Sequence, residues 1–130
     1  MVPAKIEHVN FTVVDARSTA ECLCQLFDWK VRWEGEAMAG DGYTVHVGTD
    51  EQYLAVYSPG DGLLSAAHSN YRQGSGLNHI GVVVDDIEAM EAHVKALGYK
   101  PINHADYEPG RRFYFHDDDN VEYEIVSYES

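Results

Sequence analysis

The chain has 130 residues, of which 45% are hydrophobic and 24% are charged, so one globular domain is expected. Nine Lys and Arg residues stand against 22 Asp and Glu residues, which gives a formal net charge of −13. This charge repels phosphate backbones and anionic lipids, and no apolar run approaches the roughly 20 residues needed to cross a bilayer, so neither nucleic acid nor membrane is an expected partner.

Two features predict the cellular compartment. The N-terminal segment lacks the apolar stretch of a secretory signal, so a cytoplasmic location is expected. The only two cysteines, Cys22 and Cys24, lie in a predicted helix at a spacing that does not put them on one face. They are expected to be reduced, core or half-buried thiols rather than a disulfide or a metal clip.

The first half of the chain, about 4–58, predicts the order β-α-β-β-β. A strand lies within IEHVNFTVVD at positions 6–15, and a helix follows within 16–31. Asp15 stands at the junction, where its carboxylate can cap the helix. Three short strand candidates come next and are separated by turn residues such as AGDG: 31–35, 43–48 and 53–58.

A connection at about 59–76 leads to a second copy of this order, at about 77–130. The phrase LNHIGVVVDD at 77–86 aligns with the opening phrase, which places His79 on His8 and Asp86 on Asp15. A helix is predicted within 87–102, ended by Gly98, and strand candidates follow at 100–105, 111–116 and 121–128. Each half is too small for a good core, so we expect an α+β fold in which two βαβββ modules form a single domain.

Alternation along the strands groups the candidate site residues. His8 and His79 lie on the strand faces opposite to the apolar residues expected to pack on the helices, and Glu122 and Glu124 share one face of the last strand. A single histidine on a strand is more often structural, but matched histidines in two copies favour a site. Two imidazoles and one carboxylate that converge form a metal-binding set with open positions, suited to Fe, Mn, Ni or Zn.

The doubled order, with a histidine on the first strand of each copy and Glu124 on the last strand, resembles the vicinal oxygen chelate superfamily. This superfamily holds glyoxalase I, extradiol dioxygenases, methylmalonyl-CoA epimerase and the bleomycin and fosfomycin resistance proteins. The resemblance implies curved sheets around a central cavity, a divalent metal ion held by His8, His79 and Glu124, a small-molecule substrate and a homodimer.

Other residues are candidates for catalysis. Glu122 is the rival carboxylate and a candidate base, as are His46 and a transiently released Glu124. Tyr114 is a candidate to hydrogen-bond a bound oxyanion. The chain departs from the glyoxalase I pattern at Ala55, which takes the position of a second glutamate. The stretch 113–124 resembles the dioxygenase signature but carries Asp118 and Asn120 where that signature has Pro and Gly.

Three functions stay open on the sequence. Chain length favours metal-dependent lyase or isomerase chemistry of the glyoxalase type, which Ala55 weakens. The first alternative is extradiol ring cleavage with Fe(II) and dioxygen, and the second is non-catalytic ligand sequestration of the bleomycin resistance type. Arg111 and Arg112 could meet an acidic substrate, but paired arginines beside a turn are more often solvated, and this is what we expect. The remaining histidines are expected at the surface or a pocket rim: His46, His68, His93, His104 and His116.

Overall fold

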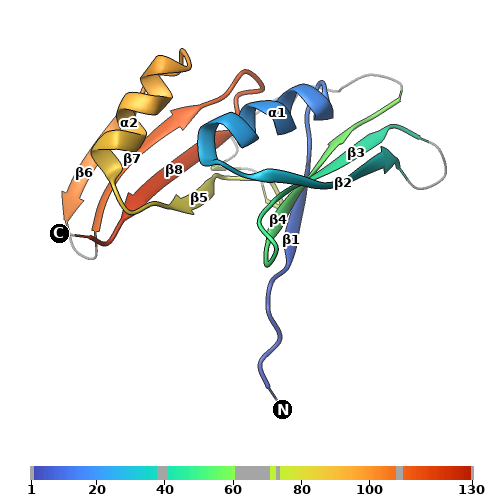
Figure 1. Cartoon of the computed structure of the whole chain (residues 1–130), viewed down its shortest axis with the longest axis horizontal. Helices are drawn as coiled ribbons and strands as arrows, with labels where there is room; N and C mark the ends of the chain where they lie inside the picture. The colour runs from blue at the N-terminus through green and yellow to red at the C-terminus, as the bar shows by residue number, and fades with distance from the viewer. Residues whose placement is uncertain (1, 38–40, 61–70, 73, 108–109, 130) are drawn as a thin grey trace. The chain divides into compact units, whose positions relative to one another are not determined.

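The computed structural model describes residues 2–37, 41–60, 71–72, 74–107 and 110–129. The chain divides into two compact units, Met1–Ala67 and His68–Ser130 (Figure 1). His68 lies outside the described residues.

The first unit is a four-stranded sheet with one helix. The sheet order is β1-β4-β3-β2, in which β1 runs parallel to β4 and the other pairs are antiparallel. Its elements, in chain order, are β1 His8–Thr12, α1 Ala16–Phe27, β2 Lys30–Glu36, β3 Tyr43–Gly48 and β4 Tyr53–Ser58.

The second unit repeats this arrangement with the sheet order β5-β8-β7-β6, again with one parallel pair, β5 and β8. Its elements are β5 Ile80–Val83, α2 Ile87–Ala96, β6 Ile102–Tyr107, β7 Gly110–His116 and β8 Glu122–Ser127. The predicted α+β fold of two βαβββ modules is confirmed. One detail differs, because the ladder of β5 begins at Ile80 and His79 therefore precedes the strand.

Each helix begins at the predicted aspartate. The Asp15 carboxylate accepts a hydrogen bond from the Ser18 amide at 3.2 Å, and the Asp86 carboxylate accepts one from the Ala89 amide at 3.0 Å. After α2 the chain turns at Gly98, whose φ of +96° favours a residue without Cβ. Both capping predictions and the predicted end of the second helix are confirmed.

One face of each sheet packs on its helix. In the first unit the buried set comes from α1 and the strands: Phe11, Ala20, Leu23, Leu26, Val45, Val47 and Val56. In the second unit it includes Ile87, Val94, Phe113, Phe115, Tyr123 and Ile125. Each large apolar side chain buried in this way contributes about 1.5–3 kcal/mol. The opposite face of each sheet is therefore the one left to carry polar side chains.

The sheet registers show which positions of the two copies correspond. Ala55 pairs with Asn10 on β1 and with His46 on β3. In the second sheet Glu124 pairs with Gly81 and Tyr114 in the same way. Ala55 is therefore the counterpart of Glu124, as the sequence alignment predicted, and the first copy lacks a carboxylate there.

Cys22 and Cys24 are half-buried thiols in α1, as expected. Among the described residues, neither helix is long and apolar enough to cross a membrane.

Candidate functional site

Polar side chains gather on the face of the second sheet that lies opposite α2. Along β8, Glu122 and Glu124 alternate with Tyr123 and Ile125, which are fully buried. Along β7, three polar residues alternate in the same way with Phe113 and Phe115: Arg112, Tyr114 and His116. Since alternate residues share a face, the strand period itself brings these polar groups together.

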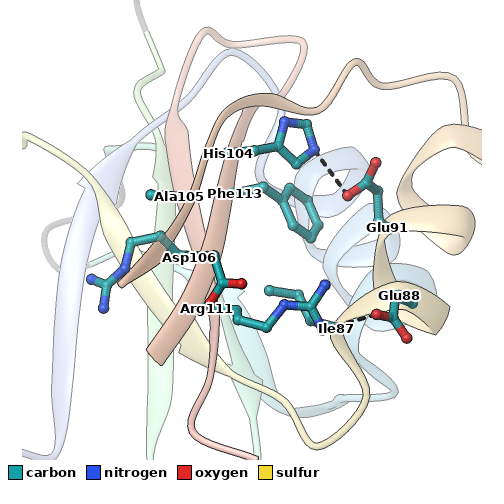
Figure 2. A pocket seen from close by; sticks show the side chains of 9 residues that line it. Ile87, Glu88, Glu91, His104, Ala105, Asp106, Arg111 and Phe113 are labelled. Atoms are coloured by element: carbon teal, nitrogen blue, oxygen red, sulfur yellow. Dashed lines mark hydrogen bonds and ion pairs between the residues drawn. The ribbon is translucent and has the colours of Figure 1, made fainter. Parts of the chain in front are cut away.

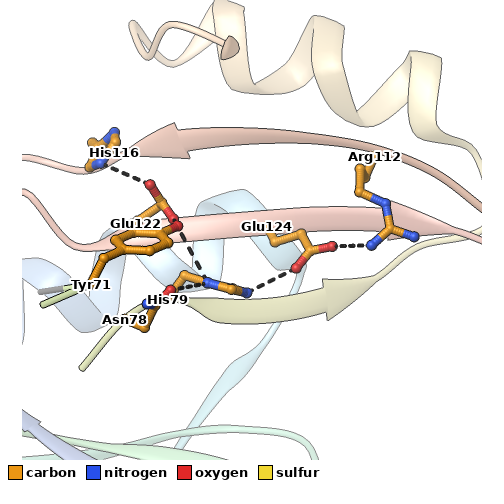
Figure 3. A network of polar contacts seen from close by, with 7 residues as sticks. All are labelled: Tyr71, Asn78, His79, Arg112, His116, Glu122 and Glu124. Atoms are coloured by element: carbon orange, nitrogen blue, oxygen red, sulfur yellow. Dashed lines mark hydrogen bonds and ion pairs between the residues drawn. The ribbon is translucent and has the colours of Figure 1, made fainter. Parts of the chain in front are cut away.

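His79 and Glu124 are in direct contact (Figure 3). The Nε2 atom of His79 lies 2.9 Å from Oε1 of Glu124. Each partner is also held by a second group: Nδ1 of His79 lies 2.6 Å from Oδ1 of Asn78, and Nη1 of Arg112 donates to Oε2 of Glu124 at 2.7 Å. The pair of predicted ligands is thus fixed on both sides.

Glu122 lies beside this pair and is only 8% exposed. The Tyr71 hydroxyl donates to Oε2 of Glu122, and Nε2 of His116 lies 3.4 Å from Oε1. Nδ1 of His79 is 3.8 Å from Oε2. The hydrogen bond to Glu122, followed by burial, raises the pKa of Tyr71 to about 12, so the phenol keeps its proton and remains a donor at neutral pH.

Tyr114 packs edge-on against the His79 ring, with the ring centroids 5.7 Å apart and the planes at 83°. Edge-to-face packing restricts the imidazole without using either ring nitrogen. The residue therefore forms part of the wall around the contact between His79 and Glu124.

His8 belongs to the first unit and is the first residue of β1. Its Nδ1 lies 3.0 Å from Oε1 of Glu7, and its ring stacks on Tyr53 at 4.9 Å. Tyr53 also stacks on His46, at 4.6 Å. Burial, with smaller effects of His8 and Arg32, lowers the pKa of His46, which favours the neutral imidazole.

A pocket of about 530 Å³ opens on the face of the first sheet opposite α1. It is lined by Asn10, Trp33, Glu36, Ala37, Asp41, Thr44, His46 and Tyr57. His46 and Tyr57 pair across the sheet with Ala55 and Thr44, so the pocket covers the part of the first copy that corresponds to Glu124 and Tyr114 in the second.

A smaller hollow of about 230 Å³ lies on the other face of the second sheet, between α2 and the strands β6 and β7 (Figure 2). Two ion pairs border it: Arg111 to Glu88 at 2.8 Å and His104 to Glu91 at 2.9 Å. These contacts tie α2 to the sheet, and Phe113 at the base is fully buried. Arg112, whose guanidinium pairs with Glu124, is also among the residues that line the hollow.

Sequence reasoning missed three residues of this network. Arg112 was expected to be solvated, but its side chain is only 14% exposed and is paired with Glu124, so that expectation is wrong. The alternation of β7 could have placed it beside Glu124. Asn78 and Tyr71 lie outside the strands, where no periodicity indicates which way a side chain points.

Two of the three predicted metal ligands come together within one unit. Two atoms bound to one ion at about 2.1 Å lie roughly 3 Å apart, and the contact of 2.9 Å between His79 and Glu124 fits this spacing. Imidazole nitrogen and carboxylate oxygen together suit Fe, Mn, Ni and Zn. Within the described part of either unit taken alone, no group of three His, Cys, Asp or Glu side chains forms a complete metal site.

Comparison with known proteins gives a consistent result for most of the chain. A family profile described as the Glyoxalase/Bleomycin resistance protein/Dioxygenase superfamily matches residues 5–125. A glyoxylase/bleomycin resistance protein/dioxygenase domain from Frankia sp. EAN1pec superposes with a TM-score of 0.80 at 19% identity, covering 96% of this chain and 92% of that one.

Two further solved structures share the fold. A glyoxalase family protein from Enterococcus faecalis has a TM-score of 0.78 at 20% identity, covering 97% of this chain and 99% of its own. The fosfomycin resistance protein FosX from Listeria monocytogenes, solved with Mn(II) and sulfate, has a TM-score of 0.73 at 18% identity, with coverages of 97% and 93%. No curated protein matches the sequence.

Proposed function

Because the chain belongs to the glyoxalase/bleomycin resistance protein/dioxygenase superfamily, we propose that it is a small metal-dependent enzyme that binds two neighbouring oxygens of a small organic substrate. We assign the metal to His8, His79 and Glu124. The observation that carries the proposal is the contact of 2.9 Å between Nε2 of His79 and Oε1 of Glu124, since two predicted ligands meet there with compatible donor atoms.

The surrounding residues orient these ligands. Asn78 holds Nδ1 of His79, which leaves Nε2 directed at Glu124, and Arg112 holds the second oxygen of Glu124. Such outer partners of a ligand set its orientation and its basicity. A divalent cation bound here supplies Lewis acidity toward substrate oxygens, and the Mn(II) in the FosX relative supports a metal of this kind.

Within this proposal, proton transfer of the lyase or isomerase type is the favoured reaction. It needs an acid or base beside the substrate, and Glu122 is a carboxylate in contact with both His79 and the Tyr71 hydroxyl. His46, whose pKa is lowered by burial, is a neutral imidazole in the pocket of the first unit and is the second candidate base. Tyr114 would orient the substrate oxygen.

Metal content tests the ligand assignment directly. Protein purified without chelator and loaded in turn with Fe(II), Mn(II), Ni(II) and Zn(II) should hold roughly one ion per chain by elemental analysis. His8→Ala, His79→Ala and Glu124→Gln should each lower this content at least about tenfold, because each removes a ligand. Absence of metal from the wild type under all loading conditions would refute the proposal of a metal-dependent enzyme and favour ligand sequestration.

Matched controls separate ligand loss from general damage. His104→Ala and Glu88→Gln remove the same kinds of side chain from ion pairs on the helix side of the second sheet. Both should keep the wild-type metal content. Loss of metal in these two variants, equal to the loss in His79→Ala and Glu124→Gln, would contradict the assignment.

The reaction type needs a separate assay. With a hemithioacetal, the Glu122→Gln variant should lose about 100-fold in kcat while its metal content stays unchanged, because only the proton-transfer group has been neutralised. Oxygen uptake coupled to ring opening of a catechol by the wild type would instead establish dioxygenase chemistry and reject the lyase or isomerase assignment.

A further inference from the structure

The pocket of the first unit has aromatic walls and an acidic rim, and its described lining residues include no Lys or Arg. We propose that this pocket binds the substrate, and that the substrate is a small aromatic compound carrying a protonated amine. The assignment of this compound class as the substrate rests on the proposed function. Binding of such a compound to the pocket can be measured without the metal.

The first aromatic wall is Trp33, which is 51% exposed and so leaves much of a large apolar ring uncovered. The ring lies over Gly35: a Cβ at that position would be 2.9 Å from Cζ2 of Trp33, closer than real contacts allow. On its other side Trp33 approaches His46, with centroids 5.0 Å apart. The exposed ring is therefore held in place, and the glycine leaves room for it.

The second aromatic wall, Tyr57, is held in the same way. Gly42 has a φ of +93°, and a Cβ there would be 2.8 Å from Cε1 of Tyr57. The Tyr57 hydroxyl donates to the backbone carbonyl of Asp41 at 3.0 Å. Both walls are thus positioned before any ligand arrives, which reduces the entropy that binding must overcome.

The charges around the pocket favour a cation. Glu36 and Asp41 line it, and Asp41 is oriented because its Oδ1 accepts a hydrogen bond from the Gly60 amide at 3.3 Å. Two neighbouring arginines are not among the described lining residues: Arg17 pairs with Glu34, and Arg32, whose charge contributes to the lowered pKa of His46, lies over the Tyr53 ring at 4.3 Å.

These features select a class of ligand. The faces of Trp and Tyr rings attract organic cations, and a net charge of −13 raises the local concentration of cations near the protein. Among the described lining residues, a carboxylate or phosphonate would meet Glu36 and Asp41 and no Lys or Arg. The volume of about 530 Å³ is within the usual range for small-molecule sites.

The test uses Trp33 as the reporter. The chain has two tryptophans, so Trp29→Phe leaves Trp33 as the only one. We would titrate this variant with phenethylamine, phenethyl alcohol and phenylacetate, which have similar sizes but differ in charge. Phenethylamine should give a saturable change in emission and bind about tenfold more tightly than the alcohol, whereas phenylacetate should not bind.

Variants of the acidic lining residues then test whether their charge causes the preference for the amine. The double variant Glu36→Gln, Asp41→Asn should bind phenethylamine about tenfold more weakly and the alcohol unchanged. Its control, Glu21→Gln with Glu51→Gln, removes equal charge from exposed sites outside the pocket lining and should bind as the parent does. Binding of phenylacetate as tight as that of the amine, or equal weakening by the two double variants, would overturn the inference.

The metal assignment and the substrate class can be refuted independently of each other. His79→Ala should lose metal but keep binding of phenethylamine, because the described lining residues of the pocket belong to the first unit. If metal binds and phenethylamine does not, the substrate class is wrong and the metal assignment stands. If phenethylamine binds and no metal does, the enzyme proposal is wrong and the pocket remains a binding site for organic cations.

Discussion

Tyr71 and Glu122 form the pair in the site whose protonation can be followed most directly. In the wild type the pKa of Tyr71 is raised to about 12, first by its hydrogen bond to Glu122 and then by burial. In Glu122→Gln the carboxylate charge is gone, so the Tyr71 pKa should fall toward the usual value of about 10.

The measurement is a pH titration of the Tyr71 ring carbon Cζ by NMR, with Tyr71→Phe identifying the resonance. The midpoint of the Tyr71 transition is compared between the wild type and Glu122→Gln. A Tyr71 midpoint that is the same in the two proteins would mean that the hydrogen bond to Glu122 is absent in solution.

Asp117 is a residue whose charge opposes folding. Burial raises its pKa, although the amides of Val121 and Asp119 donate to the carboxylate and partly offset this effect. A carboxyl whose folded pKa lies above its unfolded pKa binds protons more tightly in the folded protein. Its contribution to stability is therefore complete below the unfolded pKa and is lost as pH rises through the folded pKa.

Asp117→Asn keeps an oxygen that can accept both amides and removes the buried charge. The variant should gain stability relative to the wild type at pH 7, and this gain should shrink when the pH is lowered to about 3, where Asp117 is protonated. Urea unfolding at both values measures the difference. A gain that is larger at the acidic value would show that the Asp117 pKa is lowered.

At the scale of elements, the helix caps give a quantitative prediction. Asp86→Ala removes the carboxylate that accepts from the Ala89 amide, so the free energy of unfolding should fall by about 1 kcal/mol. Asp85→Ala is the matched control, since its backbone carbonyl, which survives substitution, accepts from Ser127. Equal losses in the two variants, measured by urea unfolding, would mean that general charge rather than capping is responsible.

The bounds of the strands show how well sequence patterns predict secondary structure in this chain. The predicted strands 43–48 and 53–58 coincide with β3 and β4, because short runs rich in Tyr and Val are flanked by turn residues there. The strand predicted at 100–105 is β6, Ile102–Tyr107, and begins two residues later. Pro101 explains the delay, since it has no amide hydrogen to donate to the ladder.

The parts of the candidate site that follow from the repeated sequence and from the two-residue period of a strand could be predicted. The match of His79 with His8 and the parity of Glu122 and Glu124 came from the sequence, and the contact between His79 and Glu124 agrees with them. The contacts of Tyr71 and Asn78 were not predictable, because they precede β5 in irregular backbone. Their partners depend on tertiary packing, which a local pattern does not encode.

For the whole molecule, the homodimer expected from the family resemblance remains a prediction. Each sheet has two edge strands, β1 and β2 in the first and β5 and β6 in the second, and edge strands can pair with another chain. Sedimentation equilibrium should give twice the chain mass of 14.6 kDa. A mass equal to one chain at all concentrations would contradict it.

The net charge of −13 predicts how salt acts on the stability of the whole chain. Two effects compete: salt screens repulsion among 22 acidic residues, and it weakens exposed ion pairs such as Arg17 with Glu34. Exposed pairs contribute only about 0–1 kcal/mol each, and nine basic residues cannot neutralise 22 acidic ones, so screening should dominate.

Raising NaCl from about 10 mM to about 150 mM, which shortens the Debye length from about 30 Å to about 8 Å, should therefore raise the Tm at pH 7. The same increase should have little effect near the isoelectric point of about 4.7, where the net charge vanishes. A Tm that falls with salt at pH 7, followed by differential scanning calorimetry, would show that ion pairs outweigh the repulsion.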